Sequence, residues 1–440
     1  MSTQTPMKPD SDSRALPKAS DYRIDVKLHD VLMDEAGPNR PNAKTVGLKG
    51  PEHESELERF PEPVYPQRTY SDETDASLKD YRRLNTLRTW DAWGKPYFAS
   101  RSLKNRKELR PIIAYLFTDY KCNLDCHYCW AYNNAVKGIS EPMAKKAVDW
   151  LDSIGNRVLA LMGGEPLLRP DLVHKITYYA AKKGFFVYLP TNGRLMRPDV
   201  IDRLGDAGLA TVNIALDSIA VKPSLPKALD AIRPNFDYLL ERQRRYGYTV
   251  AINTNICRNN MDDVRALAEL AVDRNIAIDF HINEAPMLEQ DHFEHYEENE
   301  TYLRPQEYEK IDELLDWIIE RHEGGQRIVN PLSHLHEMKN LMRGEVKERW
   351  NCRAGHNMLI IRVDGTLAPC FPMYSATHDW GSVGNHKFDH EQLDEMKLEC
   401  TKRCLSTCNY ILGFCYNTRR VAWWGMKQAL RGFKGVSGSF

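Results

Sequence analysis

The sequence predicts an α/β fold built on a parallel sheet, followed by a small cysteine-rich region. From Pro111 onward, short apolar runs alternate with amphipathic segments, which is the pattern of βα units. Six of the ten cysteines then lie between Cys352 and Cys415, after that alternation has ended. At 440 residues the chain is too long for one ordinary hydrophobic core, so we expect one large domain and a smaller appended one.

Composition excludes several classes of protein. The chain has 60 basic and 61 acidic residues, so nucleic acid is not an expected partner. No stretch approaches the roughly 18 consecutive apolar residues of a membrane span, and the polar first residues lack the apolar core of a signal peptide. Cysteines in groups of three and six, with Cys257 between them, are unlike a secreted disulfide framework. We therefore expect a soluble, cytoplasmic protein whose cysteines bind metal.

The chain before Pro111 divides in two. Residues 1–80 are rich in proline and charge and show little periodicity, which predicts an extended or mobile arm. In residues 81–110 aromatic and basic side chains return, which indicates a lead-in segment packed on the catalytic domain. No winged-helix pattern of the kind that captures a leader peptide is evident in the arm.

Six strands and five connecting helices are expected after this lead-in. The strands are the short apolar runs Ile112–Phe117, Val158–Met162, Phe186–Pro190, Thr211–Leu216, Thr249–Asn253 and Ile276–Ile282. The helices are Glu141–Ile154, Asp171–Lys183, Pro198–Asp206, Lys227–Tyr246 and Met261–Arg274. Two further amphipathic segments, Arg304–His322 and Pro331–Arg343, are expected to close the side of this domain. Ligand-binding loops of parallel barrels lie at the carboxyl ends of strands, so polar residues there are the candidate site.

Three cysteines follow the first strand in a C-x3-C-x2-C spacing: Cys122, Cys126 and Cys129. Three closely spaced thiolates can hold three irons of a [4Fe-4S] cluster and leave the fourth iron open to a small molecule. A zinc knuckle or a set of buried thiols is the alternative, since C-x2-C occurs in both. Zinc ligands usually come as two spaced pairs, so the tight triplet favours the cluster.

Met162-Gly163-Gly164-Glu165-Pro166 directly follows the second strand. With this element and the cysteine triplet, residues 110–416 resemble the radical S-adenosylmethionine (SAM) superfamily. The resemblance implies a partial (βα)6 TIM-type barrel over residues 111–345, with a [4Fe-4S] cluster on the triplet and S-adenosyl-L-methionine at the open iron. It also implies an oxidoreductase that reductively cleaves SAM to a 5'-deoxyadenosyl radical, which abstracts hydrogen from substrate. An external electron donor such as flavodoxin or ferredoxin is implied as a partner.

The resemblance assigns cofactor-binding roles to residues at the first three strand ends. Tyr128 precedes the third cysteine, where the superfamily places an aromatic residue beside the adenine. Gly163 and Gly164 let the backbone approach a ligand closely, and Glu165 can pair with the methionine ammonium. Asn192 ends the third strand in the sequence Thr191-Asn192-Gly193, which also fits a simple turn.

The fourth and fifth strand ends supply the remaining candidates. Asp217 and Ser218 follow the fourth strand. Two residues before this aspartate the superfamily often has a serine, and that serine is hydrogen-bonded to the ribose. This chain has Ala215 there, so the ribose contact falls to Asn213, Ser218 or Asn255.

The sixth strand end supplies the catalytic candidates. His281 and Glu284 are positioned to hydrogen-bond or transfer a proton to substrate, although a structural histidine and a surface glutamate fit equally.

After the fifth strand, Asn260 with Asp263 is typical of a helix cap.

The C-terminal cysteines form a second constellation. Cys352 precedes an expected hairpin with an Asp364-Gly365 turn. This hairpin would bring Cys370 back close to Cys352. Gly365-x4-Cys370 resembles the opening of SPASM and twitch domains, so residues 346–416 are expected to hold at least one auxiliary [4Fe-4S] cluster. Six thiolates suffice for one fully ligated cluster, and a structural zinc is the alternative. The candidate ligands are Cys352, Cys370, Cys400, Cys404, Cys408 and Cys415.

Residues 417–440 are basic and contain tryptophan, which predicts a terminal helix packed on the auxiliary domain or an interfacial helix in peripheral contact with lipid. The substrate stays open between a small metabolite and a ribosomal peptide. A non-catalytic zinc-binding interaction protein would explain the cysteines but not the Gly-Gly-Glu-Pro element at a strand end.

Overall fold

A computed structural model describes residues 58–65, 87–101, 108–129, 137–283, 299–344, 346–347, 349–374 and 378–430. Most of the predicted arm, residues 1–80, and the candidate Glu284 lie outside the described residues. The domain boundaries given above stay predictions.

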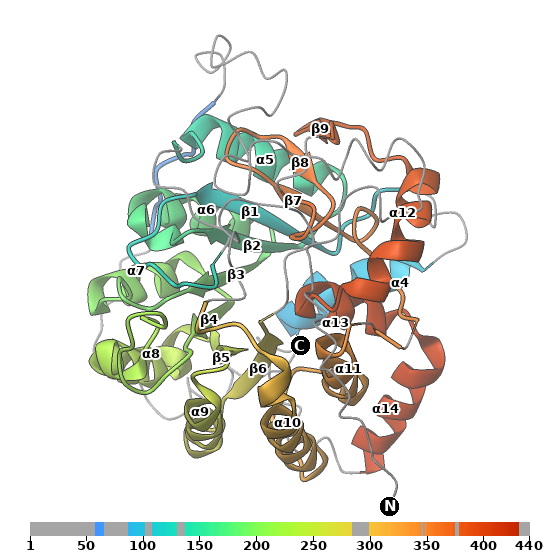
Figure 1. Ribbon diagram of the computed structural model, residues 1–440. Coiled ribbons are helices and arrows are strands. Elements are labelled where there is room, and N and C mark those ends of the chain that lie inside the picture. Colours follow the sequence, from blue (N-terminus) through green and yellow to red (C-terminus); the bar gives the residue numbers. More distant parts are fainter. Residues whose placement is uncertain are drawn as a thin grey trace, which may run out of the picture.

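One eight-stranded sheet organises the described chain, with the strand order β6-β5-β4-β3-β2-β1-β7-β8. Its first six strands in sequence run parallel, which confirms the predicted βα alternation. These strands are β1 (Ile113–Asp119), β2 (Val158–Gly163), β3 (Phe186–Thr191), β4 (Thr211–Ala215), β5 (Thr249–Ile256) and β6 (Ala277–Ile282). Figure 1 shows them curving as a partial barrel with helices on the outside. The carboxyl ends of six strands therefore meet at one mouth.

Helices connect consecutive strands as expected. They are α5 (Glu141–Ser153), α6 (Pro170–Lys182), α7 (Pro198–Ala207), α8 (Arg233–Tyr246) and α9 (Met261–Asp273). The predicted helix start at Lys227 was wrong. A short 3-10 turn (η6, Leu229–Ala231) precedes α8, which begins with Pro234 in its first turn. The Lys227 carbonyl instead accepts hydrogen bonds from the Asp217 and Ser218 amides, so this stretch lies along the end of β4.

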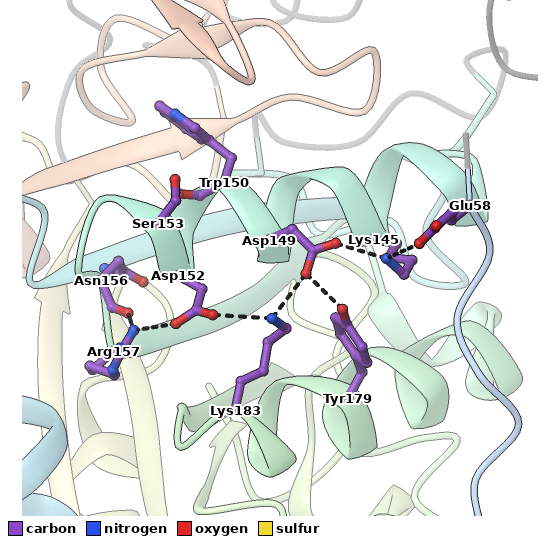
Figure 2. Close-up of polar contacts among 10 residues, drawn as sticks. All are labelled: Glu58, Lys145, Asp149, Trp150, Asp152, Ser153, Asn156, Arg157, Tyr179 and Lys183. Carbon is purple, nitrogen blue, oxygen red and sulfur yellow. Dashed lines mark hydrogen bonds and ion pairs between the residues drawn. The ribbon is translucent and has the colours of Figure 1, made fainter. Parts of the chain in front are cut away.

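The outer face of α5 and α6 is joined by an ion network, drawn in Figure 2. Asp149 on α5 accepts from Lys145 and from the Tyr179 hydroxyl, at 2.8 and 2.7 Å. Lys183 lies 3.2 Å from Asp149 and 3.1 Å from Asp152, which links the end of α6 back to α5. This network braces the scaffold away from the barrel mouth.

The chain after β6 closes the barrel and then returns to its sheet. Helices α10 (Tyr308–Glu323) and α11 (Leu332–Met342) confirm the two amphipathic predictions. The hairpin of β7 (Met358–Ile361) and β8 (Leu367–Ala368) is present, with Gly365 in the left-handed region at φ 84°. Strand β7 pairs in parallel with β1, so the cysteine-rich region begins as an extension of the barrel sheet.

Three helices and a small two-stranded ribbon follow in the described residues up to 430. They are β9 (Gly381–Ser382), β10 (Asn385–His386), α12 (His390–Arg403), α13 (Thr407–Cys415) and α14 (Thr418–Leu430). The lead-in forms η3 (Trp90–Gly94) and α4 (Lys95–Ser100). Its Trp93 packs edge-on against Phe186 of β3, and its Ser100 hydroxyl lies 2.5 Å from that of Tyr416. No helix in the described ranges is long and apolar enough to cross a membrane.

Candidate active site

The cysteine loop leaves β1 at the barrel mouth and turns back on itself. The amide of Cys129 donates to the carbonyl of Cys126 at 2.9 Å, and the Leu124 amide lies 3.4 Å from the Cys122 sulfur. Burial raises the pKa of Cys122 to about 11 and that of Cys126 further, and the neighbouring thiols of the loop add to both shifts. The three thiols therefore lie close enough to affect one another's ionisation.

The donor set of this loop fits a cluster. Within the part of the chain that the structure describes, no three His, Cys, Asp or Glu side chains converge closely enough to share one metal ion. Each cysteine of a [4Fe-4S] cluster binds a different iron, so its ligands lie farther apart than those of a single zinc. That Cys122, Cys126 and Cys129 hold such a cluster stays a prediction.

The two glycines after β2 are required by a close backbone approach. The Gly164 and Glu165 amides donate to the carbonyls of Asp119 and Lys121 at 3.1 and 2.8 Å. A Cβ on Gly163 would lie 2.5 Å from the Asp119 oxygen, and one on Gly164 would lie 2.4 Å from the Lys121 oxygen. Glycine is needed here because any side chain would push this loop off the cysteine loop.

Glu165 is buried and its carboxylate is engaged within the protein. It accepts hydrogen bonds from the Thr191 hydroxyl at 2.7 Å and from the amides of Asn192 and Leu167 at 2.9 and 3.0 Å. Burial raises its pKa, and these donors oppose the shift. The carboxylate thus ties the end of β2 to the end of β3. Pairing of Glu165 with an ammonium group stays a prediction.

Asn192 reaches the cysteine loop from the end of β3. Its side-chain amide donates to Asn123 at 2.9 Å and lies 3.9 Å from the Cys122 sulfur. Its side-chain oxygen accepts a hydrogen bond from the Arg194 backbone amide at 3.0 Å. This bond forms the simple turn that the sequence also allowed. The turn is therefore confirmed, and a cofactor contact of Asn192 stays a prediction.

Asp217, Tyr128 and Lys227 form a buried polar chain beside the thiols. The Tyr128 hydroxyl donates to Asp217 at 2.5 Å and accepts from Lys227 at 2.9 Å. Burial alone would lower the pKa of Lys227, but the Cys126 thiol and the Asp217 carboxylate outweigh it and raise that pKa. Lys227 was missed from the sequence because it was assigned to a helix. It places a positive charge against the cysteine loop.

The three candidates for the ribose contact are separated. Ser218 is fully buried, and its hydroxyl donates to the Leu225 carbonyl at 3.3 Å. The Asn255 amide donates to Asp217 at 3.0 Å, so Asn255 lies at the mouth. Asn213 lies deeper, where its side chain donates to the Tyr188 hydroxyl at 2.7 Å. Asn260 occupies the N-cap position of α9 but makes no side-chain cap bond; it donates to the Asp217 and Asn255 carbonyls instead.

Comparison with known proteins identifies the family to which the residues at the barrel mouth belong. Residues 118–271, which hold the cysteine loop, the glycine element and Asp217, match the Radical SAM superfamily. This part of the chain is a radical SAM domain.

The chain is also similar to several known proteins. It is 30% identical over 169 residues to an AdoMet-dependent heme synthase of Methanosarcina barkeri, covering 37% of this chain and 47% of that protein. It is 27% identical over 169 residues to a PqqA peptide cyclase of Ruegeria pomeroyi, covering 37% and 44%. The chain spans about half the length of the relatives it matches.

A solved structure shares the fold of the radical SAM domain. It is the crystal structure of Streptococcus suis SuiB bound to precursor peptide SuiA, with a TM-score of 0.51 and 14% identity over 79% of this chain and 80% of that chain. At this level of identity the likeness is one of fold alone.

Below the mouth of the radical SAM domain, β6 carries a paired acid and imidazole. His281 lies 3.0 Å from Asp279 through its Nε2 atom, and the Asn253 amide donates to the same carboxylate at 3.0 Å. The sequence identified His281 but not Asp279, although a single acidic residue inside an apolar strand was visible in Ile276–Ile282. A proton-transfer role for His281 stays a prediction, as does any role for Glu284.

The C-terminal cysteines do not converge on one place. Burial raises the pKa values of Cys352, Cys370 and Cys400, and the Cys352 thiol raises the other two further. Cys408 instead accepts a hydrogen bond from the Tyr115 hydroxyl inside the barrel and lies near Asp279. The Cys415 carbonyl accepts from Tyr97 of the lead-in. Cys404 is the C-cap residue that follows α12, four residues after Cys400. Three of the six thiols therefore share a region, and their assignment as ligands stays a prediction.

Proposed function

We propose that this protein is a radical SAM oxidoreductase that abstracts hydrogen from a bound substrate and completes a net oxidation or bond formation. When bound, the [4Fe-4S] cluster and SAM supply a 5'-deoxyadenosyl radical. The observation that carries the proposal is the meeting, at one barrel mouth, of three thiols, the Gly163-Gly164 loop and the Tyr128–Asp217–Lys227 chain. A zinc-binding interaction protein would need the thiols alone.

Different residues at the barrel mouth have different roles in binding the cluster and SAM. Cys122, Cys126 and Cys129 hold the cluster, and the two glycines let main-chain carbonyls approach the cofactor. Lys227 places its ammonium beside the thiols and Asp217, where it offsets their negative charge and offers a donor to a carboxylate. Tyr128 is fixed by bonds on both sides of its hydroxyl, which orients its ring at the mouth.

The C-terminal region is assigned the auxiliary cluster. Cys352, Cys370 and Cys400 influence one another, and Lys397 beside them donates to His356 at 2.7 Å. We assign these three thiols, with Cys404 as the fourth, to a SPASM-type or twitch-type cluster that accepts the electron released when the substrate is oxidised. An external flavodoxin or ferredoxin would supply the electron that starts the reaction. None of the ten cysteines, all within the described residues, forms a disulfide, which supports a reducing, cytoplasmic location.

The substrate is proposed to be a small metabolite, because two of the similar proteins are named for heme and Fe-coproporphyrin III synthesis. A ribosomal peptide is the second candidate, favoured by the similarity to a PqqA peptide cyclase. Incubating the reconstituted enzyme with each class and following substrate-dependent formation of 5'-deoxyadenosine separates them.

The central experiment is anaerobic reconstitution with iron and sulfide, followed by iron, sulfide and zinc analysis. Dithionite and SAM are then added, and 5'-deoxyadenosine is measured by liquid chromatography and mass spectrometry. We expect iron to exceed zinc and the nucleoside to form. A variant with serine at Cys122, Cys126 and Cys129 should form none, whereas Cys415→Ser serves as the matched control. Zinc without iron would overturn the proposal.

A further inference from the structure

The barrel interior below the cofactor mouth holds a buried carboxylate that no described lysine or arginine neutralises. Asp279 of β6 is 8% exposed. In the part of the chain that the structure describes, its hydrogen-bonding partners are the amides of Asn213 and Asn253, at 3.4 and 3.0 Å, and the His281 imidazole at 3.0 Å. Residues 284–298, which follow β6, contain no lysine or arginine in their sequence. A buried carboxylate is costly unless a cation or several donors compensate it.

The side chains around Asp279 add acceptors and aromatic rings rather than charge. The Asn213 carbonyl oxygen is buried and has no hydrogen-bond partner, although its amide nitrogen is used. Tyr188 on β3 and Tyr115 on β1 lie near this carboxylate. Burial keeps the pKa of each phenol well above its usual value, with Asp279 adding to the shift. Burial lowers the pKa of His334, behind the sheet, to about 4, so it stays neutral at physiological pH.

This arrangement favours one kind of group. The Asn213 oxygen needs an N–H donor, the Asp279 charge is offset by no described lysine or arginine, and electron-rich rings attract a cation. The His281 side chain is 28% exposed and that of Asp279 is 11% exposed, so neither is sealed from solvent. An anionic or purely apolar substrate part would leave the Asn213 oxygen without a donor and the Asp279 charge without a cation.

We infer that the interior of the barrel binds a cationic nitrogen of the substrate, an alkylammonium or guanidinium group, through Asp279 and Asn213. This inference rests on the proposed function and names the substrate class of the same site. Asp279 is a binding residue in this assignment, and Asn213 supplies the second acceptor. Their place below the thiols sets the cation deeper in the barrel than the atom that reacts.

Three probes of equal length and different charge test the inference: n-pentylammonium, pentan-1-ol and pentanoate. Each is titrated by calorimetry into the reconstituted protein with SAM, at constant ionic strength and under anaerobic conditions. We expect n-pentylammonium to bind about tenfold or more tightly than the other two. Broadening of its proton resonances by the reduced cluster would place it in the barrel rather than on the surface.

Asp279→Asn should abolish the preference for the cation, whereas Asp199→Asn, on the exposed start of α7, should retain it. Equal binding of the three probes, or an unchanged preference in Asp279→Asn, would overturn the inference. The comparison of probes on the unmodified protein stands even if Asp279→Asn fails to fold. Calorimetry does not require SAM cleavage, so a failed radical reaction with intact cation binding would count against the proposed function alone.

Discussion

The two groups of cysteines differ in how the chain brings them together. Cys122, Cys126 and Cys129 lie in one loop, so their proximity is local and follows from the sequence alone. The six C-terminal cysteines lie beside the β7–β8 hairpin and on or at the end of two helices, α12 and α13. Among them, the Cys352 thiol raises the pKa values of Cys370 and Cys400. Short spacing fixes a ligand set directly, whereas distant cysteines become a set only through packing.

The largest effect tests the local group. Replacing Cys126 by serine removes one ligand of the open cluster, and we expect formation of 5'-deoxyadenosine to fall to background. Iron should fall by about four atoms per chain if the cluster is lost whole. Iron analysis and the nucleoside assay measure both, and an active Cys126→Ser enzyme would contradict the assignment.

The second prediction tests the group assembled by packing. Cys370→Ser should remove the auxiliary iron while SAM cleavage at the first cluster persists. Cys408→Ser should keep both sets of iron, because its thiol is bound to Tyr115 inside the barrel. Equal iron loss in the two variants would show that Cys408 is a ligand after all.

A third prediction concerns the charge beside the first group. Lys227→Met should weaken SAM binding by about 1.5–3 kcal/mol, the usual cost of losing a hydrogen bond to a charged group. Iron content should not change, since Lys227 ligates nothing. Equilibrium binding of SAM measures the effect, with exposed Lys182→Met as the control. A wild-type affinity in Lys227→Met would remove this residue from the site.

The fourth prediction concerns the glycine loop, which packs against the loop that carries the first group of cysteines. Gly164→Ala forces a Cβ to within 2.6 Å of the Tyr120 and Lys121 backbone, which cannot yield as a flexible side chain would. We expect about 1–3 kcal/mol of lost stability and weaker SAM binding. Gly324→Ala is the control, since its Cβ would meet nothing closer than 3.3 Å. Thermal unfolding of the two variants side by side decides the matter.

The smallest effect lies in the scaffold that both groups share. Burial would raise the pKa of Asp149, but hydrogen bonds from Lys145, Tyr179 and Lys183 outweigh it and lower that pKa from 3.8. Because the folded-state pKa is the lower one, this stabilisation is complete above the unfolded value and is lost as the pH falls through the folded value. Asp149→Asn should cost less than about 1 kcal/mol at neutral pH. Denaturant unfolding at neutral and acidic pH would measure this, and iron content should not change.

The sequence predicted the barrel well because apolar periodicity is a local property. All six parallel strands lie where their apolar runs were seen, and the hairpin followed from Asp364-Gly365. The same periodicity failed at Lys227, where an apolar pattern continued through a stretch that pairs with the end of β4. Lys227, a basic residue that lies against the thiols, was missed because of that error.

What the sequence determined by itself was the fold class, the cysteine loop and the two glycines, since each depends on spacing within a few residues. Only the tertiary structure decided that Glu165 is already bonded to the end of β3, that Asn213 lies with Asp279 rather than with Asp217, and that Cys408 points into the barrel. Those partners lie far apart in the chain. Which of them meet depends on the curvature of the sheet and on the packing of α13 beneath it, and no local pattern encodes either.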